Sequence, residues 1–106
     1  MKVTNIEIYG VRWTVAFVDK DYSALANRDN FSLGTCLYRT HEIFIAEGQP
    51  SESELNTLYH ELTHAIIYQM TLHKDSYDDE DMAKFVGTYA DYIVSLAQEI
   101  LRRTNL

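Results

Sequence analysis

The chain has 106 residues, of which 46% are hydrophobic, so it has the length and apolar content of one folded domain with its own core. Its formal net charge is −7, and an acidic chain repels nucleic-acid phosphates and anionic membrane surfaces. We therefore predict a single domain over residues 1–106, with no nucleic acid and no membrane among its partners.

Cys36 is the only cysteine, so no disulfide can form within the chain, and this favours a reducing compartment. The first ten residues, MKVTNIEIYG, lack the long apolar run of a secretory signal peptide. No segment approaches the apolar length that a membrane span needs. We therefore expect a cytoplasmic location and interpret Cys36 as a small packing residue rather than a nucleophile or a ligand.

The first half of the chain has the pattern of β-strands. β-Branched and aromatic residues, partly alternating with polar ones, predict strands at residues 2–9 and 11–18, with a turn or bulge between them at Gly10. A polar stretch over residues 20–33 predicts a loop. A second pair of strands is then predicted at GTCLYR, which begins at Gly34, and at HEIFIAE, residues 41–47.

The second half has the pattern of α-helices, and the first of them is predicted at about residues 52–71. Ser51 and Glu54 match a Ser-x-x-Glu capping box at its start. Apolar residues then recur at helical spacing on one side of the helix, and His60 and His64 lie on the other side. The apolar side contains Leu55, Leu58, Leu62, Ala65 and Ile66.

A polar linker, HKDSYDD, leads into a second helix at about residues 78–103. Its first turn is acidic and its last turn contains Arg102 and Arg103, as the helix dipole favours. Strands followed by two helices predict an α+β fold, in which two packed helices cover a small, mainly antiparallel sheet.

Residues 60–64 read HELTH, a His-Glu-x-x-His pattern inside the first predicted helix. Positions four apart project from the same side of a helix, so His60 and His64 can present imidazole nitrogens to one ion. A catalytic zinc site uses such nitrogens and leaves one position for water, whose pKa the ion lowers towards neutrality. Glu61 is then placed to take the proton of that water as a general base.

Such a site needs a third protein ligand, and the residues around the start of the second helix supply the alternatives. Glu80 is favoured, because it shares one side of that helix with small residues that would let the first helix approach closely. Asp81 is the second choice, and His73 in the linker is a further alternative. The small residues are Ala83, Gly87 and Ala90.

Over roughly residues 34–95 these features resemble the smallest gluzincin-type zinc peptidases, which include short metallopeptidase-like proteins of phages and bacterial mobile elements. The resemblance rests on HEIFIAE, on the HELTHA start of the motif and on a second helix that begins with an acid. It implies a zincin-like fold with a Glu ligand on the second helix, which Glu80 matches. Lys84 departs from the pattern, because an acid often supports the metal shell at that position.

The resemblance also implies a His or Tyr near the oxyanion, for which Tyr77 and His73 are available and Tyr77 is our choice. It further implies an edge strand that binds the peptide, and HEIFIAE is the run predicted for it. The function expected is zinc-dependent hydrolysis of peptide bonds in a peptide or protein substrate. The alternative is a catalytically weak or inactive metal-binding module that acts by binding a protein partner, which the departure at Lys84 favours.

Overall fold

The computed structural model describes residues 1–27 and 31–105, so residues 28–30 of the expected 20–33 loop lie outside it. Four strands form one sheet in the order β1-β2-β4-β3. Strands β1 and β2 pair antiparallel, as do β3 and β4, and a parallel pairing of β2 with β4 joins the two hairpins. The predicted α+β class is therefore confirmed, and the sheet is mixed, with two antiparallel pairings and one parallel pairing. The strands are β1 (Lys2–Ile8), β2 (Val11–Val18), β3 (Gly34–Leu37) and β4 (Glu42–Ala46).

Strand β4, which was predicted to be an edge strand, lies inside the sheet, and that prediction is wrong. Its side chains explain the position. Ile43 and Ile45 are buried on one face of the sheet, while Phe44 and Ala46 are buried on the other. A strand that is apolar on both faces belongs in the interior of a sheet. The edge on this side is instead β3, whose residues are half-buried or exposed.

The two faces of the sheet have different covers. Both helices pack on one face over the main core, which includes Trp13 and Val15 from β2. The short 3₁₀ turn η1 (Ser23–Leu25) packs on the other face through Leu25, against Val18 and Phe44. Both faces of the central strands β2 and β4 are therefore covered. The motif histidines His60 and His64 belong to α1, on the helix-covered side of the sheet.

The first helix, α1 (Ser51–Gln69), begins close to its predicted start, but the predicted capping box of Ser51 and Glu54 is wrong. Pro50 occupies the capping position, and among the described residues no side chain caps this end. The second helix, α2 (Asp79–Thr104), has the capping box instead. The Asp78 carboxylate accepts from the Asp81 backbone N–H at 2.8 Å, and Asp81 accepts from Asp78 in return.

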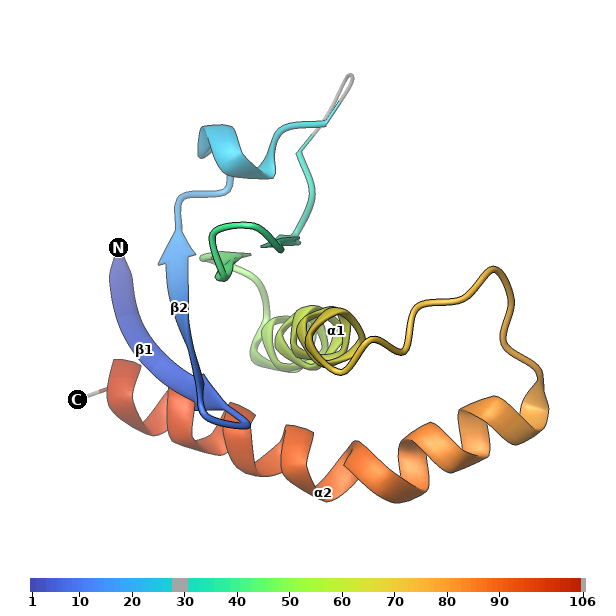
Figure 1. The fold of residues 1–106 in the computed structure, drawn as a ribbon. Helices are drawn as coiled ribbons and strands as arrows, with labels where there is room; N and C mark the ends of the chain where they lie inside the picture. Colours follow the sequence, from blue (N-terminus) through green and yellow to red (C-terminus); the bar gives the residue numbers. More distant parts are fainter. Residues whose placement is uncertain (28–30, 106) are drawn as a thin grey trace.

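Helix α2 crosses beneath the sheet and α1, and its first half projects beyond them (Figure 1). Its second half supplies the buried contacts of the helix. In the first half Ala83 and Gly87 are exposed, and a Cβ added at Gly87 would meet no described atom within 4 Å. Ala83 and Gly87 of the small-residue side therefore do not pack on α1, whereas Ala90 is half-buried. The buried residues of the second half are Ile93, Leu96, Ala97, Ile100 and Thr104.

Within the described part of the chain, neither helix combines the length and the apolarity required to cross a membrane.

Candidate metal centre

The packing of α1 on the sheet determines where the two motif histidines lie. Leu58, Leu62 and Ile66 are fully buried against the sheet, which turns the opposite side of the helix outward. On that side His60 is exposed and His64 is half-buried. The predicted division of α1 into a core side and a histidine side is therefore confirmed.

The Nε2 atoms of His60 and His64 lie 3.1 Å apart, with the ring planes inclined at 70°. Two nitrogens bound at about 2.0–2.1 Å to a tetrahedral zinc ion lie roughly 3.3 Å from each other. Two neutral imidazoles cannot direct lone pairs at each other over this distance unless a proton or a cation lies between them. The spacing of the two nitrogens is that of a hydrogen bond between the rings, and it also fits a shared zinc ion.

The surroundings of His64 favour the neutral form of its imidazole. Its partial burial lowers the pKa of the imidazole, and the nearby His60 lowers it further. A neutral imidazole has the free lone pair that a metal ligand needs.

Glu61 turns towards the sheet rather than towards solvent, and only 6% of its surface is exposed. Glu61 of α1 can lie close to β3 because β3 has a glycine, Gly34, at this point. A Cβ added at Gly34 would lie 2.6 Å from Thr57 Cγ2 and 3.1 Å from Glu61 Cγ. Burial raises the pKa of the Glu61 carboxyl, and His60 partly opposes the rise. A raised carboxyl pKa suits a general base that works near neutral pH.

An open pocket lies between the start of β3 and α1, where His60 and Glu61 form part of its wall. Edge strand β3 therefore borders the motif directly. The pocket is lined by Ser32, Leu33, Gly34, Asn56, Thr57, His60 and Glu61.

Tyr38, in the turn between β3 and β4, also reaches the motif. Its hydroxyl oxygen lies 3.5 Å from His64 Nδ1, at the outer limit of a hydrogen bond. Its ring stacks on Tyr68 of α1, with centroids 5.0 Å apart and planes inclined at 12°. The sequence interpretation did not include Tyr38, because no local signal connects a tyrosine after β3 with a histidine 26 residues later.

Cys36 is half-buried in β3 and packs against the main core. Burial raises the pKa of its thiol to about 12, with a smaller contribution from Glu61. Only the thiolate is a strong nucleophile or metal ligand, so this environment is consistent with a packing role.

Among residues 1–27 and 31–105, the structure does not bring a third ligand to the two histidines. Within the described residues, no group of three or more His, Cys, Asp or Glu side chains lies together as a metal site would need. Glu80 and His73 are exposed at the start of α2 and in the linker. Coordination by Glu80 therefore stays a prediction.

Asp81, the second choice, has other partners. It completes the cap of α2 and pairs with Lys74 Nζ at 2.7 Å. The Lys74 hydrogen bond is the largest cause of a lowered Asp81 pKa, followed by the backbone N–H of Asp78. The carboxylate would have to give up these contacts to reach a metal ion.

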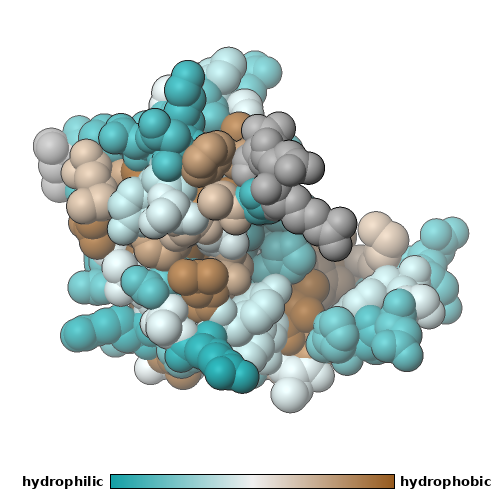
Figure 2. Space-filling model, turned by 90° about the horizontal axis from the view of Figure 1, so that it is seen from above, coloured by the Kyte–Doolittle hydropathy of each residue, from teal (hydrophilic) through white to brown (hydrophobic). Residues whose placement is uncertain are grey.

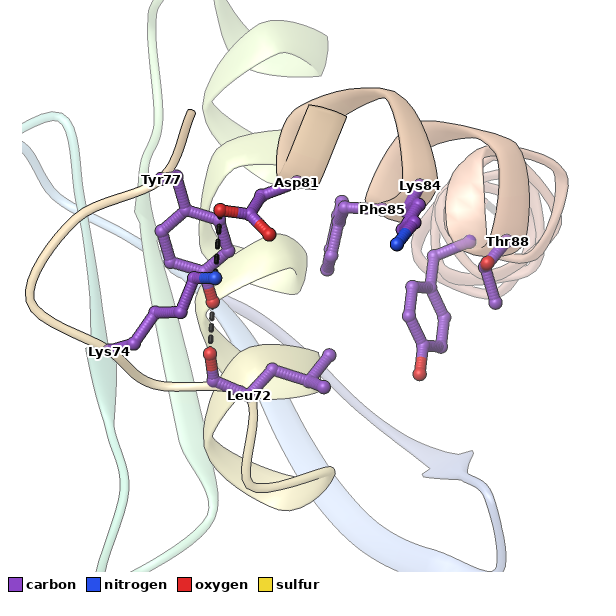
Figure 3. A pocket seen from close by; sticks show the side chains of 8 residues that line it. Leu72, Lys74, Tyr77, Asp81, Lys84, Phe85 and Thr88 are labelled. Carbon is purple, nitrogen blue, oxygen red and sulfur yellow. Dashed lines mark hydrogen bonds and ion pairs between the residues drawn. The ribbon is translucent and has the colours of Figure 1, made fainter. Parts of the chain in front are cut away.

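Tyr77 does not lie with the histidines either. Its hydroxyl donates to the Leu72 carbonyl, and Lys74 Nζ lies 5.2 Å from the centre of its ring (Figure 3). Tyr77, Asp81 and Lys84 line a pocket of the linker and α2. From above, a depression with an apolar floor separates the main body from the lobe formed by the linker and the start of α2 (Figure 2). The oxyanion role of Tyr77 stays a prediction.

Comparison with known proteins found no matching family model, no matching curated protein and no matching solved structure. The function of the chain is therefore inferred from its own residues and their arrangement.

Proposed function

We propose that the chain is a small zinc-dependent metallopeptidase with a zincin-like fold. His60 and His64 bind the ion, and Glu61 is the general base. The observation that carries this proposal is the 3.1 Å distance between the two Nε2 atoms, together with the buried carboxyl of Glu61, the residue that follows His60. Both nitrogens and the carboxyl come from one rigid helix, so their spacing is maintained without a loop movement.

Each side chain has a defined task in peptide hydrolysis. Zinc, when bound, polarises the substrate carbonyl and lowers the pKa of a water molecule. Glu61 accepts a proton from the attacking water and returns it to the departing amine. The raised pKa of Glu61 favours this exchange, because the carboxyl can hold the proton briefly at neutral pH.

The substrate would bind in an extended form along β3. This strand is an edge of the sheet, and it packs on α1 at Gly34, next to Glu61. An edge strand offers backbone N–H and C=O groups to an added peptide strand. This assignment moves the peptide-binding role from β4 to β3, in agreement with the strand order.

The test is the variant Glu61→Gln, which keeps the size of the side chain and removes the base. We expect cleavage of a mixture of unstructured peptides to fall by about 10²-fold or more, while the zinc content stays that of the wild type. Glu52→Gln is the matched control, because Glu52 is an exposed acid in the first turn of the same helix. Equal cleavage by wild type and Glu61→Gln would overturn the assignment of the base.

The alternative function is a metal-binding module that docks on a protein without cutting it. Two observations favour it: Lys84 replaces the expected supporting acid, and the described residues do not group a third donor with the histidines. In that case the wild type retains zinc, but its peptide cleavage does not exceed that of Glu61→Gln.

A further inference from the structure

We propose that Tyr38 is a positioning residue for His64. Its phenol oxygen accepts the Nδ1 proton of His64 and thereby directs Nε2 of the same ring at the metal ion. The inference rests on the proposed metal site and assigns to that site a residue outside the His-Glu-x-x-His motif.

The two nitrogens of the His64 ring face different partners. Nε2 points at His60 Nε2 at 3.1 Å, and Nδ1 faces the Tyr38 hydroxyl at 3.5 Å. A neutral imidazole has one protonated nitrogen, so a cation at Nε2 requires the proton on Nδ1. That N–H then needs an acceptor, and the Tyr38 oxygen is in place. Such outer partners determine the tautomer and the orientation of a ligand histidine.

Tyr38 is itself held in place. Its ring stacks on Tyr68, which lies one helical turn after His64 on α1. Tyr68 meets the ring of Trp13 edge-on, with centroids 6.4 Å apart. Trp13 is fully buried, and its Nε1 donates to Gln69 Oε1 at 2.8 Å. The stack therefore links the phenol to the core of the sheet rather than to a free surface loop.

His41, in the turn between β3 and β4, contacts both Trp13 and Tyr38. Its ring stacks on Trp13 with centroids 4.7 Å apart, and its backbone N–H donates to the Tyr38 carbonyl at 3.4 Å. The backbone of His41 has φ +55°, so the turn reverses sharply enough to return β4 beside β3. Both ends of this turn are thus held by aromatic contacts: Tyr38 stacks on Tyr68, and His41 stacks on Trp13.

The experiment measures zinc affinity by competition with a chromophoric chelator for wild type and Tyr38→Phe. Phe keeps the ring and its stack on Tyr68 but removes the acceptor. We expect zinc binding to weaken by about 10-fold, the lower end of the effect of losing such a partner. The unfolding midpoint measured in excess chelator should change little, because the Tyr38 side chain is exposed and its contact with His64 is long.

Tyr22→Phe is the matched control, because Tyr22 is also exposed and stacks on a ring, that of Phe44. Phe44 belongs to the core on the opposite face of the sheet, so this variant should bind zinc as the wild type does. Equal zinc affinity of Tyr38→Phe and Tyr22→Phe would overturn the inference. A wild type that binds no zinc would instead overturn the proposed function, so the two failures are distinguishable.

A second variant separates the stack from the acceptor. Tyr68→Leu removes the stacked ring and leaves the Tyr38 hydroxyl, so zinc affinity should fall by a smaller factor than in Tyr38→Phe. A larger fall than in Tyr38→Phe, with an unchanged unfolding midpoint, would contradict the role of the hydroxyl.

Discussion

Gly34 is the residue that lets strand β3 approach α1 closely enough to bury Glu61. A side chain at this position would meet Thr57 and Glu61 at once. Neither neighbour can move easily, because Thr57 donates to the Ser53 carbonyl at 2.9 Å and Glu61 is buried. The raised pKa of the Glu61 carboxyl therefore depends on the missing Cβ of a residue in another element.

Gly34→Ala should accordingly lower the free energy of unfolding by about 1–3 kcal/mol, the usual cost of overpacking. Urea unfolding followed by circular dichroism measures the change. Gly87→Ala is the matched control, since an added Cβ there meets no described atom within 4 Å and alanine favours a helix. It should raise the stability by up to about 1 kcal/mol. Equal effects of the two variants would contradict the close packing of β3 on α1.

Cys36 provides a test of the environment beside Glu61. A thiol pKa of about 12, against an ordinary value of 9.0, leaves about 10³-fold less thiolate at neutral pH. We expect alkylation by iodoacetamide to be slower in the folded protein than in the urea-unfolded protein by a large factor, as mass spectrometry would measure. Similar rates in the two states would show that Cys36 is neither buried nor close to a negative charge.

Among the elements, the sequence predicts the four strands and the two α-helices because each has a local pattern. Alternation of residues in the strands and the apolar side of α1 belong to single segments, and the predicted ends lie close to the observed ones. The cap of α1 was misassigned because Ser51 matches the pattern, while Pro50, with its extended backbone, takes the capping position.

The position of the cap predicts unequal effects of two substitutions. Asp78→Ala removes an acceptor for a free backbone N–H of α2 and should destabilise the protein by about 1 kcal/mol. Ser51→Ala should have a smaller effect, since the structure assigns no capping bond to the Ser51 side chain in the described residues. Urea unfolding of both variants compares them. A larger loss for Ser51→Ala would contradict the observed caps.

The contacts between elements were not predictable from single segments. The HEIFIAE run shows two-sided burial only once Leu25 covers the second face of the sheet. The contact of Tyr38 with His64 depends on the strand order and on the turn at His41. The small side of α2 matched a helix-packing pattern, but the second half of α2 supplies the packed surface. The motif was thus predictable, and its surroundings were not.

At the scale of the whole molecule, the first half of α2 projects from a body that is packed elsewhere (Figure 1). If Glu80 completes the metal shell, zinc must draw this half towards α1. Added zinc should then slow backbone hydrogen exchange in residues 79–88, as mass spectrometry can measure. Glu80→Gln should remove this zinc effect, while Asp79→Asn, at a neighbouring exposed acid, should keep it. Protection by zinc that survives in Glu80→Gln would exclude Glu80 as the ligand.

The most direct measurement is the zinc content of the purified protein after dialysis, for wild type, His64→Ala and His73→Ala. Removing one of two converging imidazoles should abolish binding, whereas His73 lies exposed in the linker. We expect about one zinc per chain in the wild type and in His73→Ala, and none in His64→Ala. A wild type without zinc, or His64→Ala with its zinc intact, would contradict the metal centre.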